Sequence, residues 1–149
     1  MMELREHTIA LLARREHSQL ELKQKLLNKG YKLSEVEILI ISLAVEGLQS
    51  DERYTEVYVR QRIAAGFGPH RIVAELKHRG ITDSLVRQYI PHDEMFWWEA
   101  LSQFCKKNIR SKITKKNSAR LVRFLMQRGF DSEHIYRWIQ NWIQKCQIT

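Results

Sequence analysis

Apolar residues recur along this chain at the three- and four-residue spacing of amphipathic helices. The same pattern returns three times, in segments that align without a gap: Leu22–Ile40 on Gly30, Ile72–Ile90 on Gly80 and Leu121–Ile139 on Gly129. Agreement at so many positions indicates an internal repeat of about 50 residues.

Each aligned position predicts part of a helix pair. The residues eight and four positions before the glycine are apolar and share one helix face. A cation directly precedes the glycine, where it interacts favourably with the C-terminal end of the helix dipole. Glycine readily adopts the left-handed conformation that ends a helix. The residues six and ten positions after it are apolar and predict the buried face of a second helix.

A third helix is expected before each pair, and polar residues mark where helices begin. The third helices are Leu4–Glu16, a segment starting at Ser50-Asp51, and Phe96–Lys107. The expected N-terminal caps are Ser18 with Glu21, Ser34 with Glu37, Thr82 or Asp83, Asn117 or Ser118, and Asp131 or Ser132. Pro69 fits a first helical turn, and Pro91 should end the helix before it.

The pattern predicts an all-α protein of three tandem three-helix repeats: 1–48, 49–94 and 95–149. A unit of this size is marginal alone, so we expect the repeats to stack into an elongated, curved molecule. Six glycines and two prolines are too few for the regularly spaced turns of an all-β fold.

Composition also narrows the functional class. No run approaches 18 apolar residues, and the N-terminus lacks a signal-peptide pattern, so we expect a cytoplasmic protein without a membrane span. Cys105 and Cys146 are isolated and are expected to be small hydrophobic residues rather than metal ligands. The six histidines are scattered and no catalytic motif is present, so we expect no enzyme, cofactor or metal.

The net charge of +8 lies entirely in residues 95–149, which hold eleven cations and three acids. No acid stands between Glu99 and Asp131. Such an excess favours a phosphate-rich or acidic partner over a merely solvated face. The candidate nucleic-acid or filament contacts are Lys106, Lys107, Arg110, Lys112, Lys115, Lys116, Arg120 and Arg123.

Aromatic residues share this basic region. Most are expected in the core, although they could also stack on bases. Trp97 and Trp98 are adjacent and cannot face the same way on a helix, so one of them can be exposed. The aromatic residues concerned are Phe96, Trp97, Trp98, Phe104 and Trp138.

Two stretches carry a resemblance to a known family. The first runs Ala13-Arg14-Arg15-Glu16-His17-Ser18, followed by Glu21-Leu22 and Lys25-Leu26. The second contains Gln49-Ser50-Asp51-Glu52-Arg53-Tyr54, Tyr58-Val59-Arg60, Gly66-Phe67-Gly68-Pro69-His70-Arg71-Ile72, Glu75-Leu76 and Arg79-Gly80-Ile81. Both resemble the RecX family of bacterial RecA regulators, whose members are also three tandem three-helix repeats. The third repeat shares only the skeleton and the basic bias.

The resemblance implies a non-enzymatic protein, expected as a monomer, that binds the RecA recombinase or its filament on single-stranded DNA. Family members lodge in the filament groove and usually suppress ATP hydrolysis, strand exchange and the SOS co-protease activity. Arg53, Arg60, Arg62 and Arg71 are candidate RecA contacts, with simple surface ion pairs as the alternative.

A second function remains open, that of a sequence-specific DNA-binding regulator. Leu76, Gly80 and Val86 have the spacing of a helix-turn-helix. Its second helix would offer only Arg87 and Gln88 to base edges, however, and Pro91 shortens it. Threefold repetition also favours stacking over insertion into a groove.

Overall fold

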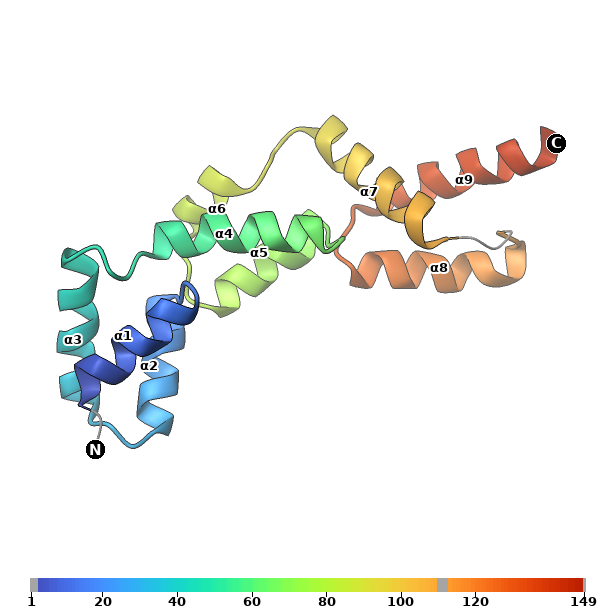
Figure 1. The fold of residues 1–149 in the computed structure, drawn as a ribbon. Coiled ribbons are helices and arrows are strands. Elements are labelled where there is room, and N and C mark those ends of the chain that lie inside the picture. The colour runs from blue at the N-terminus through green and yellow to red at the C-terminus, as the bar shows by residue number, and fades with distance from the viewer. Residues whose placement is uncertain (1–2, 110–112, 149) are drawn as a thin grey trace. The chain divides into compact units, whose positions relative to one another are not determined.

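The computed structural model describes residues 3–109 and 113–148, and Figure 1 shows the helices of this part of the chain. It contains nine α-helices and no strand, which confirms the all-α prediction. The helices are α1 (Leu4–Arg14), α2 (Gln19–Asn28), α3 (Leu33–Val45), α4 (Asp51–Ala64), α5 (Pro69–His78), α6 (Asp83–Tyr89), α7 (Glu94–Asn108), α8 (Lys115–Gln127) and α9 (Ser132–Ile148).

The repeat glycines end helices as predicted. Gly30, Gly80 and Gly129 all have a positive φ, between 80° and 97°. After α2, the Gly30 N–H donates to the Leu27 carbonyl and the Tyr31 N–H to the Leu26 carbonyl, the two bonds of a Schellman motif. The same two bonds follow α5 and α8. Each glycine therefore satisfies helix carbonyls that would otherwise lack donors.

Two expected helix starts were wrong. The Ser34–Glu37 capping box does not form, because α3 already begins at Leu33, after Lys32, and has no side-chain cap. The residue that caps α8 is Thr114 rather than Asn117 or Ser118. Its hydroxyl accepts from the Asn117 N–H, and the Asn117 side chain accepts from the Thr114 N–H. Asn117 thus takes the place of the usual Glu or Gln in a capping box.

The other predicted starts are found. Ser18 and Glu21 form the full capping box of α2. The Ser50 hydroxyl accepts from the Arg53 N–H, and the Thr82 hydroxyl from the Leu85 N–H. Asp131 accepts from the Glu133 N–H at the start of α9. α5 begins at Pro69, and α6 ends at Tyr89, two residues before Pro91.

The helices pack into two compact units. Unit 1 comprises 1–58 and 75–89, and unit 2 comprises 59–74 and 90–149. The middle three helices are therefore divided, because the end of α4 and the start of α5 belong to unit 2. Within unit 1, α2 packs on α3 around Leu22, Leu26, Val36 and Ile40.

Unit 2 has a core of its own. α9 packs on both α7 and α8 (Figure 1). The fully buried residues at its centre are Leu101, Cys105, Leu125 and Ile135. Leu125 and Ile135 occupy the repeat positions four before and six after Gly129, so the aligned apolar residues do form the core.

Candidate nucleic-acid and partner surfaces

The positive charge of the protein belongs to one compact unit. Unit 2 contains fourteen Lys and Arg against five Asp and Glu, a net charge of +9, whereas unit 1 has a net charge of −1. The sequence repeat assigned Arg60, Arg62 and Arg71 to a neutral segment, but the fold places all three in unit 2. An excess of this size favours an anionic partner for unit 2.

Three of the predicted contact residues lie along one exposed side of α8. Lys116, Arg120 and Arg123 are spaced four and three residues apart and are all exposed. Lys116 stands in the first turn, where the helix dipole disfavours a cation, and that turn contains no acid. Because folding gains nothing from this charge, an anionic partner explains it better.

The other predicted contact residues have different settings. Lys106 and Lys107 are exposed in the last turn of α7, where the helix dipole favours cations and supplies a structural reason for them. Arg110 and Lys112 lie outside the described residues, as does the side chain of Lys115.

Cys105, one turn before the end of α7, is buried, and this burial raises the pKa of its thiol to about 12, as expected for a core residue.

Three arginines surround the ring of Phe67 in the turn between α4 and α5. The guanidinium carbons of Arg62, Arg128 and Arg71 lie 3.6, 3.8 and 4.8 Å from the ring centroid. The guanidinium of Arg128 also donates to the carbonyls of Gly66 and Ala65, at 3.1 and 2.5 Å. Arg71 donates to the carbonyl of Gln127 at 3.0 Å. This cluster, which we call the Phe67 arginine cluster, joins the α4–α5 turn to the end of α8.

The charge of the cluster is concentrated. Burial lowers the pKa of Arg128, and the neighbouring guanidinium groups of Arg71 and Arg62 lower it further. An arginine remains charged under these conditions, so the cluster presents several like charges in a small volume. Such a concentration of positive charge attracts carboxylate and phosphate groups.

The structure separates the four candidate RecA contacts. It brings Arg62 and Arg71 together at Phe67 and leaves Arg60 exposed on α4. Arg53 lies in unit 1, where its guanidinium forms an ion pair with Glu16 at 2.8 Å and donates to the carbonyl of Gly47. Arg53 therefore has a structural role in holding the turn before α4.

An open groove of about 770 Å³ adjoins the Phe67 arginine cluster and shares Arg128 with it. The rings of Phe96, Phe104 and Phe124 line this groove together with Lys107. Phe96 and Phe124 are about two-fifths exposed, which is unusual for large apolar side chains. Aromatic and cationic groups therefore meet on this side of unit 2.

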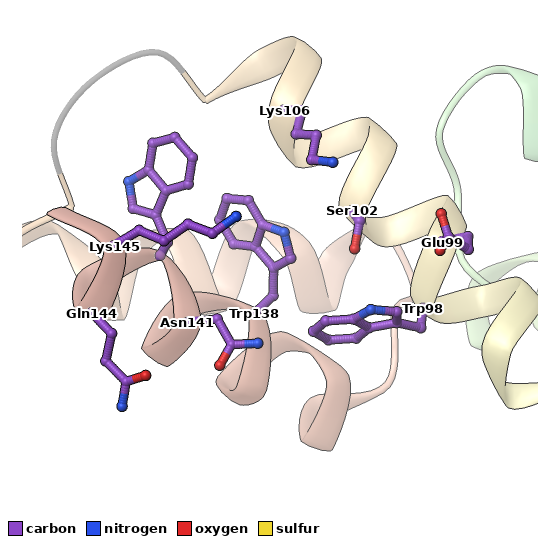
Figure 2. Close-up of a pocket in the computed structure, with 9 residues that line it drawn as sticks. Trp98, Glu99, Ser102, Lys106, Trp138, Asn141, Gln144 and Lys145 are labelled. Carbon is purple, nitrogen blue, oxygen red and sulfur yellow. The ribbon is translucent and has the colours of Figure 1, made fainter. Parts of the chain in front are cut away.

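A second pocket in unit 2 contains tryptophans. Trp97 is buried and donates its indole N–H to the Pro91 carbonyl, whereas Trp98 is half-buried and lines the pocket, as the adjacent positions predicted. Trp138, from α9, lines the same pocket (Figure 2). Sequence reasoning did not find Trp142, Asn141 and Lys145, because only the packing of α9 against α7 brings them there.

Unit 1 carries an exposed apolar face on α3. Ile38, Ile41 and Val45 follow the spacing of one helix side and are 71, 63 and 84% exposed. Leu48, three residues after the end of the helix, is also exposed. In the third repeat, the residues that align with these three are polar: Arg137, Gln140 and Gln144. The fold does not require an apolar face at this position, so a protein partner is a reason for it.

Among the described residues, no His, Cys, Asp and Glu side chains are grouped closely enough to hold a metal ion. A search of the same residues finds no helix that is long and apolar enough to cross a membrane.

Comparison with known proteins shows which family this chain belongs to. Residues 50–90 match the family model of the second three-helix domain of RecX, and 98–139 match that of the third. The regulatory protein RecX of Chromohalobacter salexigens is 37% identical over 132 residues, which cover 88% of this chain and 87% of that protein. That of Vibrio vulnificus is 35% identical over 137 residues, covering 91% and 90%.

Solved structures share the fold at lower identity. A crystal structure of RecX from Lactobacillus salivarius has a TM-score of 0.69 at 19% identity, and covers 97% of this chain and 95% of that one. Another regulatory protein RecX has a TM-score of 0.73 at 21% identity, over 92% and 70%. Since both family models and full-length relatives match, this chain belongs to the RecX family of regulatory proteins.

Proposed function

We propose that this protein binds the RecA recombinase filament on single-stranded DNA and lowers its ATP hydrolysis, strand exchange and SOS co-protease activity. Membership of the RecX family is the observation that carries the proposal. We also propose that the protein acts in the cytoplasm, as a monomer, and has no catalytic activity or cofactor of its own.

The division of charge supports a target that combines nucleic acid with protein. Unit 2, with its net charge of +9, suits the phosphates of DNA or an acidic filament surface. The exposed side of α8 and the Phe67 arginine cluster supply cations from separate parts of the chain. Lys106, Lys107, Arg110, Lys112 and Lys115 extend the proposed contact region along the sequence.

The apolar face of α3 supports the protein half of the target. Unit 1 has almost no net charge, so electrostatic attraction to DNA does not explain a contact there. Apolar side chains that are more than three-fifths exposed are typical of a surface that another protein covers. We propose that this face contacts RecA, and that Arg60, Arg62 and Arg71 contact it from unit 2.

The helix-turn-helix alternative gains no support from α6. This helix has only seven residues. Gln88, one of its two side chains suited to reading base edges, lies 3.5 Å from the Glu52 carboxylate, and the Tyr89 hydroxyl donates to the same group. A recognition helix must instead present such side chains to the major groove.

The decisive experiment titrates this protein into RecA that is hydrolysing ATP on single-stranded DNA. We expect the rate to fall at or below one molecule per RecA subunit, while the protein alone hydrolyses no ATP. Unchanged ATP hydrolysis and strand exchange, with folding verified by circular dichroism, would contradict the proposal. Protection of a single DNA site in a footprinting assay would favour the helix-turn-helix alternative.

A further inference from the structure

The pocket between α7 and α9 is built from residues of both helices within unit 2. Its volume is about 400 Å³, and it is open on one side. Figure 2 shows Trp98, Ser102 and Trp138 around the space, with Lys106 and Lys145 on opposite helices beside it. The lining residues are Trp98, Glu99, Ser102, Lys106, Trp138, Asn141, Trp142, Gln144 and Lys145.

The aromatic wall of this pocket is ordered by ring contacts. Trp138 and Trp142 are stacked, with ring centroids 5.4 Å apart and planes 14° from parallel. The guanidinium of Arg137 lies 5.6 Å from the centroid of Trp98, and the ring of His134 meets Trp98 edge to face. These neighbours orient the Trp98 indole, which is still only half-buried. A half-buried indole held in one orientation offers a planar surface for stacking.

Polar groups stand beside the aromatic wall. Lys106 and Lys145 supply two exposed ammonium groups, against the single carboxylate of Glu99. Asn141 and Gln144 supply amides, which can both donate and accept hydrogen bonds. The indole N–H of Trp142 is buried without a hydrogen-bond acceptor among the described residues, which is uncommon in a pure packing core.

This combination selects one class of ligand. Indole planes attract flat π systems, ammonium groups attract phosphate, and amides match the donors and acceptors on the edge of a base. An apolar peptide side chain would use the rings but not the cations, and a free phosphate would use the cations but not the rings. A nucleotide within a single strand uses both.

We propose that this pocket holds one unpaired nucleobase of single-stranded DNA, stacked on Trp98, with the adjoining phosphates beside Lys106 and Lys145. The inference rests on the proposed function, because it specifies how unit 2 contacts the nucleic acid. It differs from a purely electrostatic contact, in which only the backbone of the strand is bound. Stacking is largely independent of base identity, so the pocket needs no sequence preference.

The test separates stacking from charge by comparing two fluorescent oligonucleotides of equal length and charge, an oligothymidylate and its abasic counterpart. Binding is measured by fluorescence anisotropy in the absence of RecA. We expect the wild-type protein to bind the oligothymidylate between about five-fold and about a hundred-fold more tightly than the abasic strand. Trp98→Ala should remove this preference, with both strands then binding as the abasic strand does.

Two control variants complete the design. Tyr136→Ala removes an aromatic ring that is 55% exposed on α9 but does not line the pocket, and it should keep the full preference. Lys106→Gln combined with Lys145→Gln should weaken binding of both strands by a similar factor. Circular dichroism verifies that each variant is folded.

Each result decides the question. Equal binding of the two strands by the wild-type protein, binding of neither strand, or a preference that survives Trp98→Ala would overturn the proposed stacking site. Assays of RecA ATP hydrolysis with the same proteins keep this outcome distinct from a failure of the proposed function. Inhibition of RecA by wild-type protein that shows no base preference would leave the proposed function standing without the pocket.

Discussion

The backbone N–H of Gly68 donates to the carbonyl oxygen of Arg128 at 2.7 Å. The two chain segments approach so closely here that a Cβ atom on Gly68 would lie 2.4 Å from the carbonyl carbon of Gly129. Conversely, a Cβ atom on Gly129 would lie 2.5 Å from the backbone nitrogen of Arg71. The turn before α5 and the turn after α8 thus fit together only because both contain glycine.

The same contact occurs in unit 1 with a different donor. The Ser18 hydroxyl donates to the carbonyl oxygen of Arg79 at 2.9 Å. Ser18 and Gly68 both lie twelve residues before their repeat glycine, and Arg79 and Arg128 both directly precede theirs. One geometry therefore joins the second helix of a repeat to the glycine turn of the next repeat, first through a side chain and then through the backbone.

This geometry ranks the effects of glycine substitutions on stability. Gly68→Ala should lower the free energy of unfolding by about 1–3 kcal/mol, because the backbone atoms it meets cannot move away easily. Gly129→Ala should cost at least as much, since it adds left-handed strain to a similar clash. Gly30→Ala, with open space around its Cβ, should cost only about 1 kcal/mol of strain. Gly80→Val should cost a few kcal/mol, because its Cβ would lie 2.9 Å from that of Leu20.

Urea unfolding followed by circular dichroism measures these differences. If Gly68→Ala proves no more destabilising than Gly30→Ala, the close approach of the two turns is wrong. Unchanged stability in the Gly30, Gly80 and Gly129 variants would contradict the repeat alignment itself.

Ser18 should matter more than an ordinary helix cap. Its hydroxyl accepts from the Glu21 N–H and also donates to the Arg79 carbonyl, and the residue is fully buried. Ser18→Ala should therefore lower the free energy of unfolding by about 2–3 kcal/mol, since it removes a helix cap and also leaves the Arg79 carbonyl without this donor. Thr114→Ala is the matched control, because Thr114 caps α8 from an exposed position. A cost for Ser18→Ala no larger than that for Thr114→Ala would contradict this role.

The repeat, the glycine turns and the Ser18 capping box could all be predicted from the sequence, because each depends on residues close together in the chain. The caps of α3 and α8 could not be predicted so well. Near the start of α8, Thr114, Asn117 and Ser118 all have suitable side chains, whereas α3 begins before its one candidate, Ser34, without any side-chain cap. Thr114 was missed because its partner three residues on is Asn117 rather than Glu or Gln.

The surfaces were less predictable than the helices. The net charge of each repeat predicted a nucleic-acid contact surface in the third repeat alone. It could not show that Arg62 and Arg71 of the second repeat lie beside Arg128 at Phe67. The tryptophan pocket likewise depends on which sides of α7 and α9 face each other. Apolar periodicity does not determine that rotation when both helices have aromatic residues on more than one side.

Stability should depend on pH through His17. The ring is buried, its Nδ1 lies 3.0 Å from the Arg15 carbonyl, and its Nε2 lies 2.9 Å from the Lys25 ammonium. Nδ1–H therefore donates to the carbonyl, and Nε2 accepts from Lys25. Burial lowers the pKa of His17, and the positive charges of Arg15 and Lys25 lower it further.

The folded protein thus resists protonation of His17 more than the unfolded chain does. The free energy of unfolding should be at its full value above about pH 6.5, the unfolded pKa of histidine, and should fall as the pH drops through the lower folded pKa. Urea unfolding at several pH values measures this dependence. His17→Gln should flatten the curve in this range. A curve in His17→Gln with the slope of the wild-type protein would exclude His17 as its source.

The apolar face of α3 provides a test of the protein contact. Val45→Glu places a charge on the most exposed residue of this face and should weaken inhibition of RecA about ten-fold or more, because the charge would have to be buried in the interface. Gln24→Glu adds the same charge to an exposed position of α2, outside the apolar face of α3, and should have little effect. Single-stranded DNA binding should be unchanged in both variants. Equal inhibition by the two variants would indicate that α3 does not contact RecA.

The exposed cations of α8 should set the salt dependence of DNA binding. If the protein contacts about four to six phosphates of a single strand, the logarithm of its affinity should fall with the logarithm of salt concentration with a slope of about −3 to −4. Changing Lys116, Arg120 and Arg123 together to Gln should make that slope shallower by about 2. Each phosphate contact that is lost reduces the number of counterions released on binding. Stability should hardly change, because all three side chains are exposed and the helix dipole disfavours Lys116.

The matched control changes Arg14, Lys29 and Lys32 to Gln, which removes three exposed cations from unit 1. Both triple variants lower the net charge by the same amount, so a general effect of charge would flatten the two slopes equally. A local contact would flatten only the slope of the α8 variant, and would weaken inhibition of RecA most at low salt, where phosphate contacts contribute most to affinity. A wild-type slope in the α8 variant would mean that its basic side is solvated and contacts no phosphate.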